Sequence, residues 1–326
     1  MRQNLLVLFH ILSSVSCLLT PAVSAPLPTF EDFRRVDSVR RLTGQLLTGE
    51  LLEVTRVDPA LIMRTAQEKA GDAKLLWGAA ELLTDWPRKR AMFQAALQAG
   101  DSNVAIQVRF ACAAAQNRDF DLALTLSQDC RKRDSSNFVP WLSELWVLQQ
   151  QKKPLPALQP PCWATFRDYS AEAGRARVGL LEVAGYSRYS ARRLGFMPEA
   201  VAVGMARDFA RPPVDTNVAP VLLLIAKSMQ ESGTFLLTEL VGQTLENAVL
   251  ASRPDAATSP EVAYRTMEID KRRAELKTLL ADVERNVVEV ATEPEMVQYF
   301  DNVLTIGEET AVKRLTEVVR GKPGTP

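Results

Sequence analysis

The recurrence of similar residues at a spacing of 34 positions is the feature of this 326-residue sequence that most constrains its fold. A period of this length is typical of stacked helical hairpins, each of which needs its neighbours to bury its apolar face. Arrays of this kind serve mainly as binding scaffolds, so the sequence predicts a helical array that binds rather than catalyses. The residues that recur at this spacing are Asp85 and Asp119, Trp86 and Phe120, Ala96 and Cys130, Asp101 and Ser135, and Asn103 and Asn137.

Residues 1–25 have the pattern of a secretory leader. Arg2 precedes an apolar stretch, and small residues lead up to Ala25. The stretch is shorter than the roughly 20 apolar residues of a membrane span, and no later segment is longer. We therefore expect an exported protein, periplasmic or secreted, that is cleaved after Ala25. Lipidation of Cys17 is the alternative, and it alone would attach the chain to a membrane.

The histidine content restricts the possible chemistry. The only histidine, His10, lies in the predicted leader. A chain without imidazole lacks the common general base, the Ser-His-Asp and Cys-His nucleophiles, and histidine ligands for zinc or iron. Basic and acidic residues are balanced at 39 each, which argues against a nucleic-acid partner. We expect no cofactor, no metal and no nucleic acid, and binding rather than catalysis.

The sequence also contains three basic triplets, and three cysteines after the predicted leader, whose environment can be predicted. Acidic neighbours dilute the triplets, so we expect solvated helix ends or faces. Cys112 and Cys130 are expected to be small buried residues, and Cys130 with Cys162 is the only pair that merits a disulfide test. The triplets are Arg88-Lys89-Arg90, Arg131-Lys132-Arg133 and Lys271-Arg272-Arg273.

Helical periodicity runs through most of the chain, and alternating β-patterning is missing, which predicts an all-α fold. Four prolines in residues 154–161 predict an extended linker, followed by a less regular, glycine-rich stretch that ends near Arg211. We expect a repeat domain over 26–153, a C-terminal helical domain over 162–320 and a disordered tail over 321–326. Helix starts are expected at Thr29, Asp58, Asp72, Asn137, Ser259 and Thr292, and helix breaks near Gly233 and Gly307.

The long helix expected from Pro260 to about Ala291 carries an apolar stripe. A solvated opposite face is the ordinary explanation for its charges, and a coiled-coil dimer through the stripe is the alternative. The stripe consists of Leu276, Leu280, Val283, Val287 and Val290.

Residues 104–137 resemble a tetratricopeptide repeat. Phe110-Ala111 supply the large and small pair of its first helix, while Ala123 and Cys130 supply the small positions of its second. The units on either side match in part. The resemblance implies an α-α superhelix whose first helices line a concave face. The implied contact positions are Lys74, Gly78, Val108, Cys112, Leu142 and Trp146.

These concave positions are mostly apolar or small, unlike the cationic clamps with which that family holds a carboxylate. An apolar peptide could dock there, or the C-terminal helices of the same chain could fill the face. We favour the second, because apolar surface left in water costs roughly 25 cal/mol per Å². The partner of the scaffold is expected to be a protein or peptide.

A second resemblance points to catalysis. Residues 220–232, which end in Glu231-Ser232, resemble the helix that carries the catalytic acid of lytic transglycosylases, and Glu295 with Tyr299 looks like a late motif of that family. The resemblance implies peptidoglycan cleavage by Glu231. Phe235 is displaced by one position, however, and the segments that would enclose the acid have no counterpart. The scaffold is therefore the first hypothesis and the enzyme the alternative.

Overall fold

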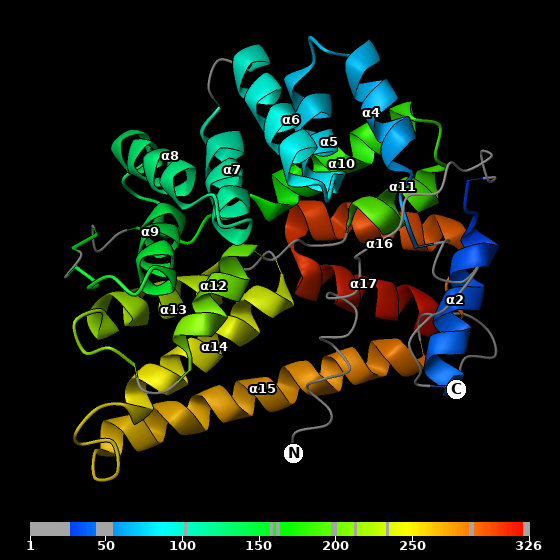
Figure 1. Cartoon of the computed structure of the whole chain (residues 1–326). Helices are drawn as coiled ribbons and strands as arrows, with labels where there is room; N and C mark the ends of the chain where they lie inside the picture. The colour runs from blue at the N-terminus through cyan, green and yellow to red at the C-terminus, as the bar shows by residue number, and fades with distance from the viewer. Residues whose placement is uncertain are drawn as a thin grey trace.

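The structure is a computed structural model that describes residues 27–43, 55–100, 103–156, 159–160, 164–196, 201–211, 214–232, 235–286 and 290–321. These residues form fifteen helices and one isolated bridge, so the predicted all-α fold is confirmed (Figure 1). The predicted leader, Cys17, Cys162 and residues 322–326 lie outside the described residues.

Apart from its first helix, the first half of the described chain is a row of helices in which each packs on the next. Figure 1 shows α4 to α9 following one another around one edge of the molecule, with α5 and α6, and α7 and α8, as antiparallel hairpins. The helices are α2 (Phe30–Thr43), α4 (Pro59–Glu68), α5 (Ala73–Leu82), α6 (Trp86–Ala99), α7 (Val104–Gln116), α8 (Phe120–Arg133) and α9 (Phe138–Gln150).

Short polar side chains start most of these helices, as the sequence predicts. Asp58, Asp72 and Asn137 each accept a hydrogen bond from a backbone N–H of the first helical turn. Thr29 and Asp32 bond to one another's backbone N–H groups at the start of α2. These predicted helix starts are confirmed.

The stretch after residues 154–161 is helical, not irregular, which corrects the sequence prediction. It forms α10 (Ser170–Val183), α11 (Arg188–Gly195) and α12 (Val201–Phe209). Two of its glycines lie at close helix contacts: a Cβ on Gly174 would be 2.9 Å from Leu304, and one on Gly195 would be 2.8 Å from Val178. Gly174 thus permits close packing inside α10 without breaking it.

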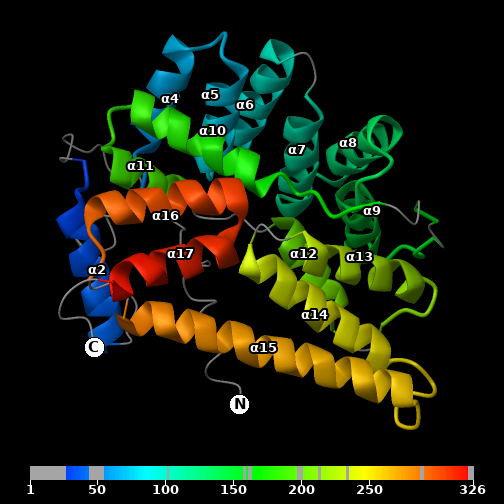
Figure 2. The ribbon, with the colours of Figure 1, turned by 180° about the vertical axis from the view of Figure 1, so that it is seen from behind.

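The last five helices form two hairpins and a long connecting helix. The predicted breaks near Gly233 and at Gly307 are confirmed, as is the capping box of Thr292 and Glu295. Figure 2 shows α15 along the edge of the molecule opposite α4–α6, beside α14 and α17. The helices are α13 (Ala219–Glu231), α14 (Leu236–Ala251), α15 (Pro260–Asn286), α16 (Glu293–Ile306) and α17 (Glu308–Arg320).

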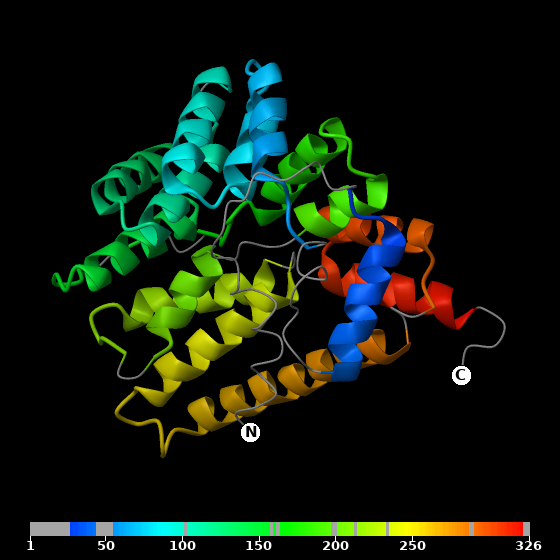
Figure 3. The ribbon, with the colours of Figure 1, turned by 45° about the vertical axis from the view of Figure 1, so that its right-hand side comes forward.

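Two hydrophobic cores hold the helices together, and each draws on both sides of residues 154–161. The first joins α4–α7 to α10, α11, α16 and α17, and the second joins α7–α9 to α12, α13 and α14. Trp86, Leu122 and Tyr169 pack against both. Figure 3 shows the later helices lying beneath the earlier row.

An extended strap, residues 164–168, ties the row to the later helices. Thr165 forms a parallel bridge with Asn137, whose side chain is fully buried and bonds to the backbone N–H and C=O of Arg167 at 3.2 and 2.8 Å. On its other side the strap donates the Phe166 N–H to Ser228 Oγ of α13 at 2.5 Å. The buried polar groups of the strap are thus satisfied from both halves of the chain.

Candidate functional site

The inner face of the helical row is covered by later helices of the same chain. At one end α10 lies so close to α5 that a Cβ on Gly78 would be 2.3 Å from the Ala176 carbonyl oxygen. At the other end α12 packs on α7 and α9, and Val108 and Leu142 are at most 1% exposed. The sequence allowed two occupants for this face, an apolar peptide or the C-terminal helices of the same chain. In the structure the C-terminal helices occupy it.

The structure buries most of the positions predicted for partner contacts. Val108, Cys112 and Leu142 are buried among apolar side chains, and Trp146 donates its indole N–H to Asp208 of α12 at 3.0 Å. Only Lys74 is exposed. The packing of the chain on itself hides five of the six predicted contact positions, Gly78 among them, wholly or in part.

The two described cysteines are buried and unpaired, as the sequence predicts for small core residues. Burial raises the pKa of both the Cys112 and the Cys130 thiol to about 12, because the thiolate would lose its hydration. The predicted partner of Cys130, Cys162, lies outside the described residues.

Cys112 and Cys130 are expected to resist alkylation in the folded protein at pH 8. Their thiolates are scarce at that pH, and the reagent cannot reach them. Peptide-level mass spectrometry after iodoacetamide treatment measures the modification of each cysteine. Both should react fully once the chain is unfolded in guanidinium, and rapid modification of either one in the folded protein would contradict this placement.

Glu231, the residue of the catalytic alternative, is exposed at the C-terminal end of α13. The other members of that motif have structural roles: Glu295 accepts from the Thr292 N–H at 2.7 Å, and Tyr299 packs on Phe196 and Phe300. Phe235 is buried in the first core. The described residues do not enclose Glu231 in the apolar pocket that a catalytic carboxylic acid requires.

A buried ionic cluster joins α5, α7 and α10, and the sequence analysis did not identify it. Glu81 accepts two hydrogen bonds from Arg109, at 2.8 and 2.6 Å, and one from the Trp77 indole at 3.0 Å. Arg177 Nη1 lies 3.6 Å from the same carboxylate. Although burial opposes ionisation, Arg109 holds the pKa of Glu81 at about 2. The cluster connects the row to α10.

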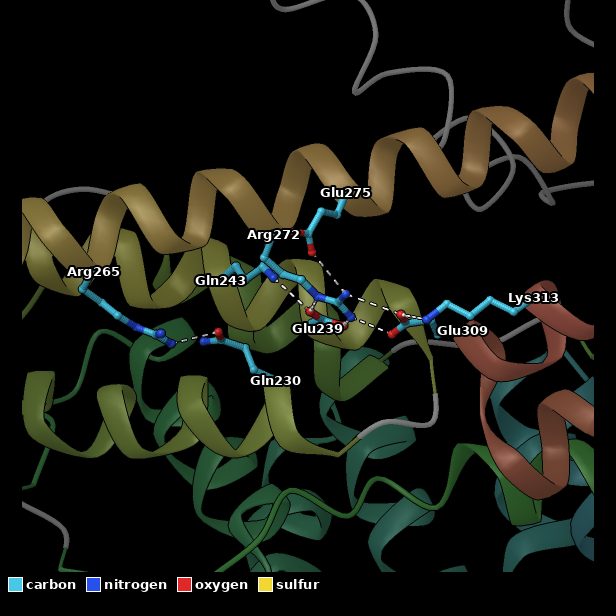
Figure 4. Close-up of polar contacts among 8 residues, drawn as sticks. All are labelled: Gln230, Glu239, Gln243, Arg265, Arg272, Glu275, Glu309 and Lys313. Carbon is cyan, nitrogen blue, oxygen red and sulfur yellow. Dashed lines mark hydrogen bonds and ion pairs between the residues drawn. The ribbon is translucent and has the colours of Figure 1, made fainter.

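The inward face of α15 combines apolar and ionic contacts. Val262, Ile269 and Leu276 are buried at intervals of seven residues, and Arg265 and Arg272 lie between them. Leu276, from the stripe proposed for dimerisation, thus faces its own chain. Figure 4 shows Arg272 extending from α15 toward α14 and α17, and Arg265 extending toward Gln230 of α13. We call these five residues the inner seam.

The arginines of the inner seam bind carboxylates of neighbouring helices. Arg272 donates to Glu239 of α14 at 2.7 Å and to Glu309 of α17 at 2.6 Å (Figure 4). Arg265 donates to Glu246 of α14 at 2.8 Å. The hydrogen bond from Arg272 lowers the pKa of Glu309 to about 2. The ion pairs fix which face of α15 points inward.

The expectation that the basic triplets are solvated is therefore wrong for at least three of their residues. Arg272 joins three helices, and Lys89 is buried close to Glu81. Arg131 pairs with Glu144 and stacks on the Trp141 ring, 3.9 Å from its centroid. Tertiary contacts, rather than the local sequence, set the environment of these cations.

The substitution Arg272→Gln is expected to lower the free energy of unfolding by about 1 kcal/mol, because the guanidinium is partly exposed and water screens its pairs. It should also speed hydrogen exchange in α15 more than in α7, since the inner seam has few apolar contacts. Hydrogen-exchange mass spectrometry measures both rates. Lys313→Gln, which removes only an exposed pair with Glu309, should leave α15 unchanged; equal effects of both variants would contradict the role of Arg272.

The outward face of α15 carries the two large apolar side chains that are most exposed to solvent among the described residues. Tyr264 and Met267 are 59% and 60% exposed, more than any other large apolar side chain of the described residues. They begin a line at alternating three- and four-residue spacing, which keeps to one helix face. We call it the outer stripe; it consists of Tyr264, Met267, Lys271, Ala274, Thr278 and Ala281.

The described residues contain no group of three or more histidine, cysteine, aspartate or glutamate side chains placed to hold a metal ion. None of the helices that the structure describes has the length and apolarity needed to cross a membrane. Comparison of the chain with protein-family models, with curated proteins and with solved structures finds no match.

Proposed function

We propose that this protein is an exported helical scaffold that binds another protein, and that the outer stripe of α15 is its contact surface. The observation that carries the proposal is the exposure of Tyr264 and Met267, one turn apart on a 27-residue helix. Tyrosine and methionine are enriched in protein interfaces: tyrosine offers a large contact area with little loss of conformational freedom, and methionine adapts its flexible apolar side chain to the partner.

Three further features support a scaffold. The hairpins α5–α6 and α7–α8 carry the residues that recur at a spacing of 34 positions, and they form a repeat-like row. Glu81, the buried carboxylate of that row, is engaged by Arg109 and the Trp77 indole within the protein. The leader-like residues 1–25 support export.

The scaffold is tested by placing a photo-crosslinking amino acid at Met267 in the native host and identifying adducts by mass spectrometry. We expect a discrete protein adduct at Met267. The matched control is the same amino acid at Thr310, an exposed position of α17, where no such adduct should form. Absence of an adduct at Met267, or the same adducts at both positions, would overturn the proposal.

The catalytic alternative has its own test. Purified protein incubated with peptidoglycan is expected to release no muropeptides, because Glu231 is exposed and the described residues do not enclose it. Release that disappears in the Glu231→Gln variant, measured by chromatography of the soluble products, would replace the scaffold with the enzyme.

A further inference from the structure

The outer stripe changes in side-chain size along its length. Its N-terminal half carries the long side chains of Tyr264, Met267 and Lys271, and its C-terminal half carries the short ones of Ala274, Thr278 and Ala281. All except Ala281, which is half-buried, are exposed.

A gradient of this kind is self-complementary when two copies of the helix run antiparallel. The residues of the stripe then form layers, and each layer pairs one residue of the first copy with one of the second. Lys271 thus faces Ala274 of the second copy. Met267 faces Thr278 of the second copy in the same way, and Tyr264 faces Ala281. Every layer places a long side chain against a short one, which is how closely approaching helices interdigitate.

The charges beside the stripe agree with the same pairing. Asp270 and Lys277 are exposed on one flank, and the antiparallel arrangement places Asp270 opposite Lys277 of the second copy twice in each dimer. On the other flank Glu268 and Glu275 are already paired with Arg265 and Arg272 of their own chain at 3.2 and 3.7 Å. A parallel arrangement would instead oppose Lys271 to Lys271, which costs energy.

The position of α15 in the fold makes the stripe accessible. The helix forms the edge of the molecule opposite α4–α6 in both Figure 1 and Figure 2. The inner seam fixes its rotation, because Arg265 and Arg272 bind carboxylates on α14 and α17. The outer stripe is therefore presented in one orientation on a rigid support about 40 Å long.

We propose that the partner of the outer stripe is a second copy of this chain, which binds through an antiparallel α15–α15 contact about a two-fold axis. The inference rests on the proposed function, because it names the partner of the same surface. The contact is isologous: each residue that the first copy contributes is also contributed by the second, so the pair closes and does not extend into a filament.

The oligomeric state is the first test. Sedimentation velocity across micromolar to millimolar concentration should show a species of twice the mass of one chain. Ala274→Arg should weaken it roughly a hundredfold, because each dimer carries the clash with Lys271 twice. Thr310→Arg adds the same side chain to an exposed position of α17 and should leave the dimer intact. A monomer at every concentration, or a dimer unaffected by Ala274→Arg, would overturn the proposal.

The geometry is the second test. Within one helix, Met267 and Thr278 are about 16 Å apart along the axis. A mixture of the Met267→Cys and Thr278→Cys variants should therefore crosslink with a short bismaleimide, while each variant alone should give no more than the wild-type background. Crosslinking of Met267→Cys by itself would indicate a parallel pair and contradict the antiparallel one.

A charge exchange tests the flank without altering the stripe. Asp270→Lys should weaken the dimer about tenfold, since two opposite-charge pairs become like-charge pairs. Adding Lys277→Asp should restore it, an outcome that mere unfolding would not produce. Failure of the second change to restore the dimer would exclude the proposed register.

Failure of the self-association and failure of the scaffold give different results. A monomeric protein whose Met267 photo-adduct contains a different protein would overturn the second copy as partner and retain the scaffold. A protein that gives no adduct at Met267, not even with itself, would overturn both.

Discussion

The substitution Glu81→Gln is expected to lower the free energy of unfolding by about 3–5 kcal/mol, the usual cost of breaking a buried ion pair from one side. The glutamine has the same shape but no charge, so Arg109 and Arg177 would remain buried without their counter-ion. Urea denaturation followed by far-UV circular dichroism at pH 7 measures the loss. A cost below about 1 kcal/mol would contradict the role of the cluster.

Arg109→Met is the matched comparison, and it should cost less than Glu81→Gln. It leaves the carboxylate with Arg177 at 3.6 Å and with the field of Lys89, whereas Glu81→Gln removes the only anion that accepts hydrogen bonds from Arg109 and the Trp77 indole among the contacts described. The reverse order of the two costs would indicate that Arg177 does not contribute.

The pH dependence of the same residue has a definite sign. The pKa of Glu81 is about 2 in the folded protein, below its ordinary value of 4.5. Its contribution to stability is therefore complete above pH 4.5 and is lost as the pH falls toward 2. The stability difference between the wild type and Glu81→Gln should be constant near neutrality and shrink in acid, and a difference that grows in acid would contradict the pKa shift.

Gly78→Ala is expected to destabilise the protein by about 2–3 kcal/mol, the upper part of the range for overpacking. The added Cβ would lie 2.3 Å from the Ala176 carbonyl oxygen, and a backbone atom cannot rotate away as a side chain can. The helices α5 and α10 would have to separate, and Trp77 beside Gly78 would lose part of its cover. Near-UV circular dichroism and thermal unfolding together detect this separation.

Gly204→Ala is the control for Gly78→Ala. It makes the same change within a helix, but a Cβ at Gly204 would meet no atom within 4 Å. Alanine is the better helix former, so this variant should be as stable as the wild type or gain up to about 1 kcal/mol. Equal losses in both variants would show that helix propensity, not the contact with Ala176, determines the cost at Gly78.

Local signals in the sequence predicted the helices well. Asp58, Asp72 and the Thr292 capping box mark helix starts because a side-chain oxygen satisfies backbone N–H groups that have no other partner. Phe110, predicted as the large packing residue of its helix, is buried and stacks on Phe93 with ring centroids 5.0 Å apart. Such features depend on a few neighbouring residues, which the sequence displays.

Features that depend on distant residues were not predicted. The glycines in the region of α10 and α11 predicted a less regular stretch. In the structure Gly174 instead makes room for Leu304, a residue 130 positions away. Glu81 and Arg109 are ordinary surface residue types, yet both are buried in the packing of α5, α7 and α10. The seven-residue spacing of Val262, Ile269 and Leu276 was a visible signal for the inner seam, but it did not reveal that Arg265 and Arg272 would find carboxylates on α14 and α17.

The strap also determines the order in which the chain can complete its fold. Asn137, which starts α9, also bonds to residues 165–167 of the strap, and the strap reaches Ser228 in turn. A growing polypeptide that has passed residue 153 still exposes Val108 and Leu142, because α12 has not been synthesised. The early hairpins can therefore complete their packing only after the later half has been synthesised. A fragment ending at residue 153 should be partly folded and prone to aggregate.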